Sequence, residues 1–211
     1  GAIGCALFTW YQYLNNPRKT DDKSDFMKGS YLGPKYNNST IESFLKYNNY
    51  HYQTLTDEAL PERIADLIAN EYVIGWFQGK FEWGPRALGN RSILADPRKA
   101  EMKDIVNTKI KFREPFRPFA PAVTVEAARN YFDIPETTNG MPERFMLLVV
   151  PVLEAKSDQI PAVNHLGTAR VQVIHHETNP LYSDVITTFG EATGTPVLMN
   201  TSFNIRGEPI V

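Results

Sequence analysis

Hydrophobic residues recur at helical spacing in several segments that polar stretches separate. The clearest pattern lies in residues 57–72, where Leu60, Ile64 and Ile68 would share one face and Pro61 would stand in the first turn. Further helices are predicted over residues 2–14, 40–48, 101–111 and 180–193.

Residues with strong capping preferences mark the ends of two of these helices. A helix over 40–48 would be capped at its amino end by Ser39 or Thr40. Gly194 would close the helix over 180–193, because glycine adopts the left-handed backbone conformation of a helix end without strain.

Short apolar runs between the helices predict β-strands. They cover residues 73–77, 92–95, 119–125, 145–153, 169–174 and 196–199. A short turn of helix is expected just before the second strand. Because strands and helices alternate without a strict β–α–β period, we expect an α/β (α+β) domain on a mixed sheet.

Composition and charge narrow the class of protein. With 42% hydrophobic and 22% charged residues among 211, the chain is typical of a globular domain. A net charge of -2 argues against a dedicated nucleic-acid or membrane-surface binder.

The single cysteine, Cys5, permits no internal disulfide and fits a reducing compartment, so we expect a cytoplasmic location. No apolar run reaches the roughly 20 residues of a membrane span.

The amino-terminal part of the sequence differs in character from the rest. Residues 1–16 are small and apolar with aromatic residues on several sides, which favours a helix that packs on something larger. Residues 17–56 are polar and rich in turn signals, which predicts a linker and peripheral segment. The main domain is expected over 57–211, in a chain that is a fragment of a longer protein.

The densest candidate site lies in residues 75–98, which are rich in glycine and arginine. The glycines would let the backbone approach a ligand, and Arg86 and Arg91 carry forked donors suited to phosphate or carboxylate. A plainer interpretation is a surface loop whose arginines pair with Glu82 and Asp96.

A second cluster places four cations among phenylalanines and prolines in residues 109–119. The cations are Lys109, Lys111, Arg113 and Arg117. The prolines would limit how far they move. Basic residues interleaved with aromatic ones can also bind RNA, but no wider basic surface accompanies them. They could equally be solvated neighbours of core phenylalanines.

Two further segments carry polar groups next to predicted strands. By strand alternation, Arg170 and Gln172 would share a face, and His165 before them is either a general acid or base or simply solvated. The hydroxyl of Ser202 and the amide of Asn204 lie in a turn that could hold phosphate, or that is a plain turn.

No metal site is predicted. His175 and His176 are adjacent on a predicted strand and would point to opposite faces, so they would not converge on one ion. The sequence also lacks the usual phosphate-loop, nucleophile-elbow and zinc-protease motifs.

Four strings resemble, in order, the carboxy-terminal domain of the nodulation and antibiotic-biosynthesis O-carbamoyltransferases. They are residues 82–93, 113–121, 167–172 and 200–209. The resemblance implies a YrdC-like twisted mixed sheet with flanking helices and a concave ligand face. It also implies that 1–16 is the last helix of a preceding ATPase-like domain, and that the domain over 57–211 is truncated at its carboxy end.

The resemblance implies an enzyme that binds carbamoyl phosphate and ATP with Mg²⁺ and forms carbamoyl-adenylate for transfer to a substrate hydroxyl. The expected partner of this domain is the amino-terminal domain of the same polypeptide. An iron-type metal would lie only in that amino-terminal domain. The residues expected to act on carbamoyl phosphate or the nucleotide phosphates are Arg86, Lys111, Arg117 and Arg170. Those expected to bind or orient the nucleotide are Ser202, Asn204, Arg91, Arg113 and His165.

Two alternatives belong to other classes. One is an enzyme resembling threonylcarbamoyl-adenylate synthase on the same fold, which would need sites for bicarbonate and threonine. The other is a noncatalytic module that binds nucleotide or RNA, against which the acidic isoelectric point counts.

Overall fold

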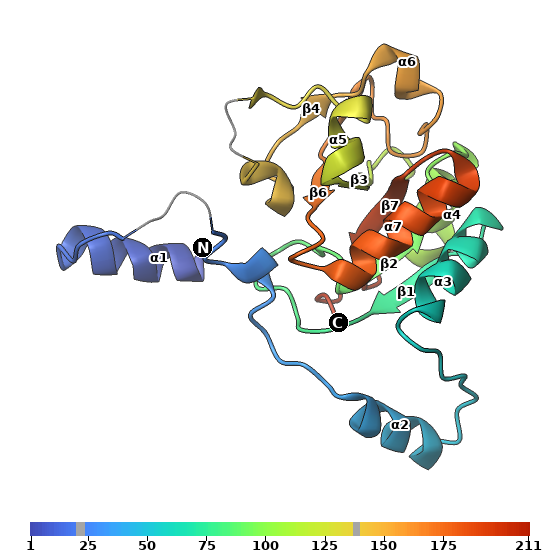
Figure 1. The fold of residues 1–211 in the computed structure, drawn as a ribbon, viewed down its shortest axis with the longest axis horizontal. Coiled ribbons are helices and arrows are strands. Elements are labelled where there is room, and N and C mark those ends of the chain that lie inside the picture. Colours follow the sequence, from blue (N-terminus) through green and yellow to red (C-terminus); the bar gives the residue numbers. More distant parts are fainter. Residues whose placement is uncertain (20–23, 137–139) are drawn as a thin grey trace.

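The computed structural model describes residues 1–19, 24–136 and 140–211. Its centre is a five-stranded sheet in the order β1-β2-β7-β3-β6 (Figure 1). The strands are β1 Ile74–Phe77, β2 Arg91–Ala95, β7 Val197–Ser202, β3 Ala120–Thr124 and β6 Gln172–Ile174. Neighbours are antiparallel except β3 and β6, which are parallel. The prediction of a mixed sheet is therefore confirmed.

Side chains alternate along the central strands and supply two cores, one on each face of the sheet. In β7, Leu198 joins a core under α3 (Ala59–Ala69) and α7 (Pro180–Thr193). Its neighbours Val197 and Met199 join the core on the opposite face. That second core is covered by α4 (Glu101–Ile105), the π-helical turn η3 (Val106–Ile110) and α5 (Val125–Tyr131).

The helices agree well with the hydrophobic pattern. α7 covers the predicted residues and ends at Gly194, whose φ of 76° is the left-handed cap conformation. α2 (Asn38–Tyr47) begins earlier than expected and is capped by Asn37, not by Ser39 or Thr40. The Asn37 side-chain oxygen accepts from the backbone N–H of Thr40 at 2.8 Å, which is the usual capping contact.

Two amino-terminal helical segments lie outside the main body. α1 (Ala2–Phe8) continues directly into the π-helical η1 (Thr9–Tyr13), and Figure 1 shows them projecting away from the sheet. Neither has a buried residue, and their exposed aromatic side chains include Phe8, Trp10 and Tyr13. Residues 28–35 return to the domain, beginning with the 3₁₀ turn η2 (Lys28–Ser30).

The prediction of a strand over 145–153 was wrong for most of its length. A 3₁₀ turn, η5 (Pro142–Phe145), comes first, and Met146 has a left-handed φ of 55° that breaks the extended backbone. Only β4 (Val150–Pro151) remains, and it pairs with β5 (Thr168–Ala169) in a separate two-stranded sheet.

Other short elements also differ from the sequence pattern. The run 169–174 is divided between β5 and β6, which lie in different sheets, so Arg170 falls between two strands. The helical turn expected before β2 is absent from the described residues 81–90, which form bends. The four-residue α6 (Glu154–Ser157) was too short to show a hydrophobic period.

Within the described part of the chain, the helices lack the length and apolar character that a membrane span requires.

Candidate functional site

A hollow of about 440 Å³ lies where the loop before β2 meets the end of β7. From the first sequence motif it is lined by Glu82, Gly84 and Arg86. From the fourth it is lined by Ser202 and Asn204. Two motifs more than one hundred residues apart therefore form the walls of one space.

Lys111 joins the second motif to this wall. Its Nζ donates to the backbone carbonyl of Ser202, and it lies 3.2 Å from the Ser202 hydroxyl. It also lies 2.8 Å from both the carbonyl and the side-chain oxygen of Asn204. The residue is only 4% exposed, and burial, with a smaller contribution from Arg113, lowers the Lys111 pKa to about 8.

The loop that carries Arg86 is held by one carboxylate. Glu82 Oε1 accepts the backbone N–H groups of Leu88 at 2.8 Å, Asn90 at 2.7 Å and Arg91 at 3.1 Å. Hydrogen bonds to an ionised acceptor are stronger than neutral ones, so the loop is preorganised. Arg86 itself is exposed at the hollow.

Buried amides hold the same loop from the sheet side. Gln172 Nε2 donates to the Leu88 carbonyl at 2.7 Å, and Asn200 Nδ2 donates to the Ala87 carbonyl at 3.2 Å. Asn200 also donates to Gln172 Oε1 at 2.8 Å. Gln172 therefore serves as an internal support for the loop.

Arg170 brings a second cation close to Arg86. Among the described residues, no hydrogen-bond partner accepts from its buried Nε. Desolvation lowers the Arg170 pKa, and the like charge of Arg86 adds to this effect. Two arginines near each other, neither of them in an ion pair with a described carboxylate, are a favourable environment for an anion.

Arg113 and Arg117 lie beside Lys111 in sequence but have different surroundings. Arg113 Nε donates to Asn107 Oδ1 at 2.7 Å, and its guanidinium lies 4.8 Å from the centre of the Phe119 ring. Arg117 is exposed and lies 3.9 Å from the Glu114 carboxylate. Arg113 is therefore oriented by the fold, whereas the Arg117 side chain takes part in a weak surface ion pair.

Sequence reasoning missed Arg206 as a member of this basic surface. A hydrogen bond to its own backbone lowers the pKa of the Glu114 carboxyl, and the nearby charges of Arg117, Arg206 and Arg113 lower it further. Arg206 thus lies near the second motif. The available signal was its position two residues after Asn204 in the fourth string.

The Arg91 side chain is packed inside the protein. It is fully buried, and its NH1 donates to the carbonyls of Gln78 at 2.6 Å and Asn90 at 2.8 Å. Its guanidinium carbon lies 3.6 Å and 3.9 Å from the ring centres of Phe77 and Phe81. These contacts turn Arg91 toward the protein interior.

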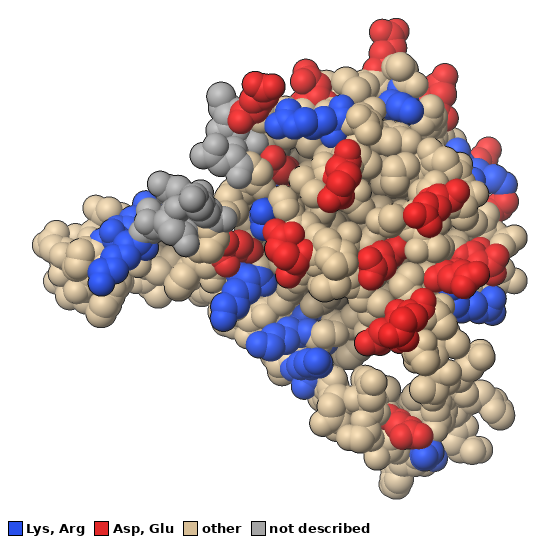
Figure 2. Space-filling view, viewed as in Figure 1, with Lys and Arg blue, Asp and Glu red and all other residues tan. Residues whose placement is uncertain are grey.

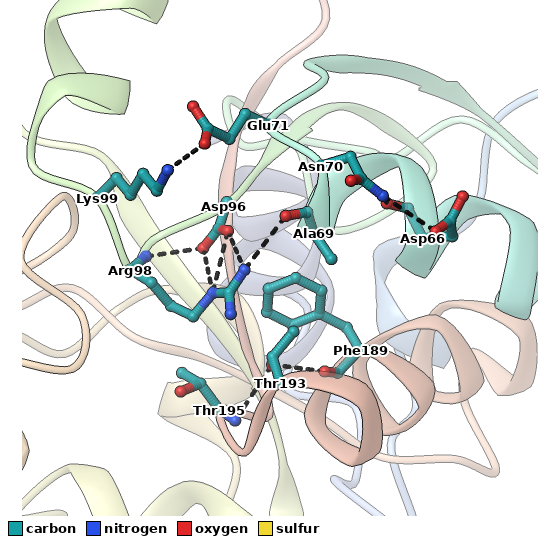
Figure 3. Close-up of polar contacts among 10 residues, drawn as sticks. All are labelled: Asp66, Ala69, Asn70, Glu71, Asp96, Arg98, Lys99, Phe189, Thr193 and Thr195. Carbon is teal, nitrogen blue, oxygen red and sulfur yellow. Dashed lines mark hydrogen bonds and ion pairs between the residues drawn. The ribbon is translucent and has the colours of Figure 1, made fainter.

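Of the ion pairs that the sequence offered as an alternative for this motif, one forms, and it involves neither Arg86 nor Arg91. Asp96 is fully buried and pairs with Arg98, whose NH2 lies 2.6 Å from Asp96 Oδ2 (Figure 3). Glu82 is engaged by backbone N–H groups instead. Among the described residues Arg86 forms no ion pair, which leaves its exposed side chain available to a ligand.

The three histidines considered in the sequence do not line the hollow beside Arg86. His165 begins a tight turn in which its backbone N–H donates to the Thr168 carbonyl at 2.8 Å. His175 Nδ1 lies 3.4 Å from the Glu177 carboxylate, whereas His176 Nε2 lies 3.4 Å from Asp184. The two adjacent histidines therefore contact different partners.

A larger depression on the molecule has the opposite charge. It lies between α3 and α7, on the face where Figure 2 shows several acidic side chains. The carboxylates that line it belong to Asp57, Glu58, Glu62, Asp184 and Glu191. Such a surface would repel phosphate, so the hollow beside Arg86 is the better candidate for an anionic ligand.

Comparison with known sequences gives one family and several long relatives. Residues 65–211 match the model described as "Carbamoyltransferase C-terminus". The whole chain is 44% identical to nodulation protein NolO of Bradyrhizobium diazoefficiens and 42% identical to nodulation protein NolNO of Sinorhizobium fredii. It covers 37% and 30% of those proteins, so it spans about a third of the length of these curated relatives.

Comparison with solved structures shows the fold. T. kodakarensis HypF gives a TM-score of 0.53 at 18% identity, over 77% of this chain and 19% of that one. P. abyssi Sua5, solved in complex with L-threonine, gives a TM-score of 0.50 at 16% identity, over 75% and 42%. The expected YrdC-like fold is therefore confirmed.

Proposed function

Because this chain belongs to the carbamoyltransferase C-terminus family, we propose that it is the ATP-dependent part of an O-carbamoyltransferase. It binds carbamoyl phosphate and the Mg²⁺ complex of ATP and forms carbamoyl-adenylate. The observation that carries the proposal is the contact of Lys111 with Ser202 and Asn204 beside the hollow that Arg86 lines.

Every phosphate group of carbamoyl phosphate and ATP must appear in a product of the reaction. Water releases inorganic phosphate and carbamate from carbamoyl phosphate. A carbamate oxygen then attacks the α-phosphorus of ATP, the bond from that phosphorus to the bridging oxygen breaks, and pyrophosphate leaves. Every reactant and leaving group is an anion, so positioning and charge neutralisation are the main tasks of the protein.

The cations of the site fit these tasks. Arg86 and Arg170 neutralise carbamoyl phosphate and the leaving phosphate, since neither pairs with a carboxylate in the part of the chain that the structure describes and Arg86 lines the hollow. Lys111 holds Ser202 and Asn204 in place for the nucleotide phosphates. Arg117, supported by Arg113 and Arg206, would extend the positive surface along the nucleotide.

The nucleotide brings its own Mg²⁺ as part of the substrate. Mg²⁺ keeps much of its water and takes few protein ligands when it accompanies phosphates. Two carboxylates, Glu82 and Glu208, line the hollow, and Glu82 is already engaged by backbone N–H groups. The chain is proposed to bind the complex mainly through its phosphates.

Transfer to the acceptor hydroxyl is proposed to take place in the part of the longer protein that precedes this chain. The relatives NolO and NolNO extend well beyond the length matched here. The exposed aromatic side chains of α1 and η1 suit contact with such a part. The acceptor would be a small molecule with a free hydroxyl.

Exchange of labelled pyrophosphate into ATP tests the reaction on the 211-residue chain. Label should enter ATP only when carbamoyl phosphate is present, because exchange requires the reversible formation of carbamoyl-adenylate. Arg170→Ala should slow exchange by about one hundredfold if it neutralises a reacting anion. Arg63→Ala, which alters an exposed pair on α3, should not change the rate.

Two results would contradict the proposal. One is the absence of exchange in a folded chain that binds both ligands. The other is exchange that depends on threonine and bicarbonate instead of carbamoyl phosphate, which would favour chemistry of the threonylcarbamoyl-adenylate type.

A further inference from the structure

Residues 28–35, here named the strap, lie against the loop that carries Arg86. At one end of the contact, the Trp83 backbone N–H donates to the Ser30 carbonyl at 2.7 Å. The Ser30 hydroxyl donates to the Trp83 carbonyl at 2.6 Å. Ser30 is 5% exposed, so these bonds are shielded from water.

The strap pairs with the same chain segment further along. The Gly33 N–H donates to the Phe81 carbonyl at 3.0 Å, and the Phe81 N–H donates to the Pro34 carbonyl at 3.0 Å. Lys35 and Lys80 form an antiparallel bridge. A Cβ on Gly33 would lie 2.5 Å from the Phe81 Cβ, so the approach requires glycine.

Tyr31 reaches past this pairing to the other end of the loop. Its hydroxyl donates to the Leu88 carbonyl at 2.6 Å and accepts from Asn179 Nδ2 at 3.0 Å. The Tyr31 ring packs against the small core that contains Leu88. Desolvation raises the Tyr31 pKa above its ordinary value, so the hydroxyl remains a donor at physiological pH.

The strap thus holds the loop on both sides of Arg86, at Trp83 and at Leu88. We propose that Tyr31 is a positioning residue that acts through Arg86 and sets the geometry of the anion site. This inference rests on the proposed function. Its consequence is that a displacement of the strap alters anion binding without a contact between the strap and the ligand.

The Tyr31 hydroxyl can be removed without leaving the loop unsupported. The Leu88 carbonyl keeps its bond from Gln172 Nε2, and Asn179 Nδ2 keeps its bond to Asn90 Oδ1 at 2.9 Å. Tyr31→Phe should therefore fold normally. The ring stays in place, and the bonds lost are those that the hydroxyl makes to the Leu88 carbonyl and accepts from Asn179 Nδ2.

The test measures carbamoyl phosphate binding by calorimetry in the 211-residue chain. Tyr31→Phe should weaken binding by about three- to tenfold, the effect of one well-placed hydrogen bond. Tyr36→Phe removes a half-exposed hydroxyl just beyond the strap and should leave binding unchanged. Gly33→Ala should weaken binding in the same direction as Tyr31→Phe because it pushes the strap off Phe81.

A double-mutant comparison separates positioning from general structure. If Tyr31 acts through Arg86, Tyr31→Phe should cause no further loss when Arg86 is already alanine. An equal loss in both backgrounds, or no loss in either, would overturn the inference.

Hydrogen exchange without ligand keeps this test independent of the proposed function. The backbone N–H groups of Leu88 and Asn90 should exchange faster in Tyr31→Phe than in the wild type or in Tyr36→Phe. Unchanged exchange would overturn the inference. Faster exchange in a chain that binds no carbamoyl phosphate would instead refute the proposed ligand and retain the link between strap and loop.

Discussion

The Lys111 ammonium nitrogen lies 2.8 Å from the carbonyl oxygen of Asn204, a residue 93 positions further along the chain. Lys111 follows η3, whereas Asn204 follows β7, so the contact ties a helical turn to the end of a central strand. A buried ammonium group is costly unless acceptors surround it. Here the acceptors are the polar groups that line the candidate site.

The pH dependence of stability should report Lys111. Its pKa is about 8 in the folded chain, below the value of 10.5 for an ordinary lysine. Below pH 8 both states are protonated, but between the two pKa values the unfolded chain binds more protons, so stability rises with pH. Relative to Lys111→Met, the wild type should gain free energy of unfolding from about pH 8 to about pH 10.

Denaturant unfolding at several pH values measures this difference. Comparison with Lys111→Met cancels the titration of other lysines and tyrosines. A difference between the two proteins that stays flat across this window would show that the Lys111 pKa is not lowered.

Substitution of Arg91 should lower the stability of the fold, whereas substitution of Arg86 should leave it almost unchanged. Arg91→Ala takes away the guanidinium donor of the Gln78 carbonyl and leaves a void between Phe77 and Phe81, so it should cost about 3 kcal/mol or more of stability. Arg86→Ala alters an exposed side chain and should change stability by less than about 0.5 kcal/mol.

Thermal unfolding and phosphate binding, measured on both variants, check this contrast. Arg86→Ala should bind anions at least about tenfold more weakly while it keeps its melting temperature. A stable Arg91→Ala with impaired binding would instead assign Arg91 a direct role in the site.

Glu114→Gln should strengthen the binding of an anionic ligand. The Glu114 carboxylate lies 3.9 Å from Arg117 and partly neutralises the surrounding arginines. Because an exposed ion pair is weak, the affinity should rise by only about two- to fivefold. Pyrophosphate titrations at low salt measure this, with Glu101→Gln on α4 as the control. Equal or weaker binding by Glu114→Gln would place Arg117 outside the site.

Glu82→Ala should destabilise the loop that carries Arg86. Three backbone N–H groups lose their shared acceptor, which should cost about 2 kcal/mol. Glu208→Ala removes another carboxylate that lines the same hollow and should stay within about 0.5 kcal/mol of the wild type. Chemical denaturation compares the two, and equal stabilities would show that Glu82 does not organise the loop.

The elements that the sequence predicted well are those with local signals. α7 has a proline at its start, a hydrophobic face and Gly194 at its end, so its bounds follow from neighbouring residues alone. The apolar run 145–153 carries no such signals. Its interruption by the left-handed Met146 depends on packing that the sequence pattern does not express.

The candidate site shows the same limit. The resemblance brought Arg86, Ser202 and Asn204 forward, and they line one hollow. The inward position of Arg91 depends on rings from two other segments of the chain. Tyr31 stands in a polar stretch with turn signals, and only its contact with the Leu88 carbonyl, 57 residues away, shows that it supports the loop.

Calorimetric titration of the folded 211-residue chain with carbamoyl phosphate, with and without a nonhydrolysable ATP analogue and Mg²⁺, is the decisive experiment. We expect saturable binding that the nucleotide analogue alters and that falls by at least about tenfold in Arg86→Ala. Binding that is unchanged in Arg86→Ala, or absent from the folded wild type, would contradict the claim that the hollow beside Arg86 is the carbamoyl phosphate site.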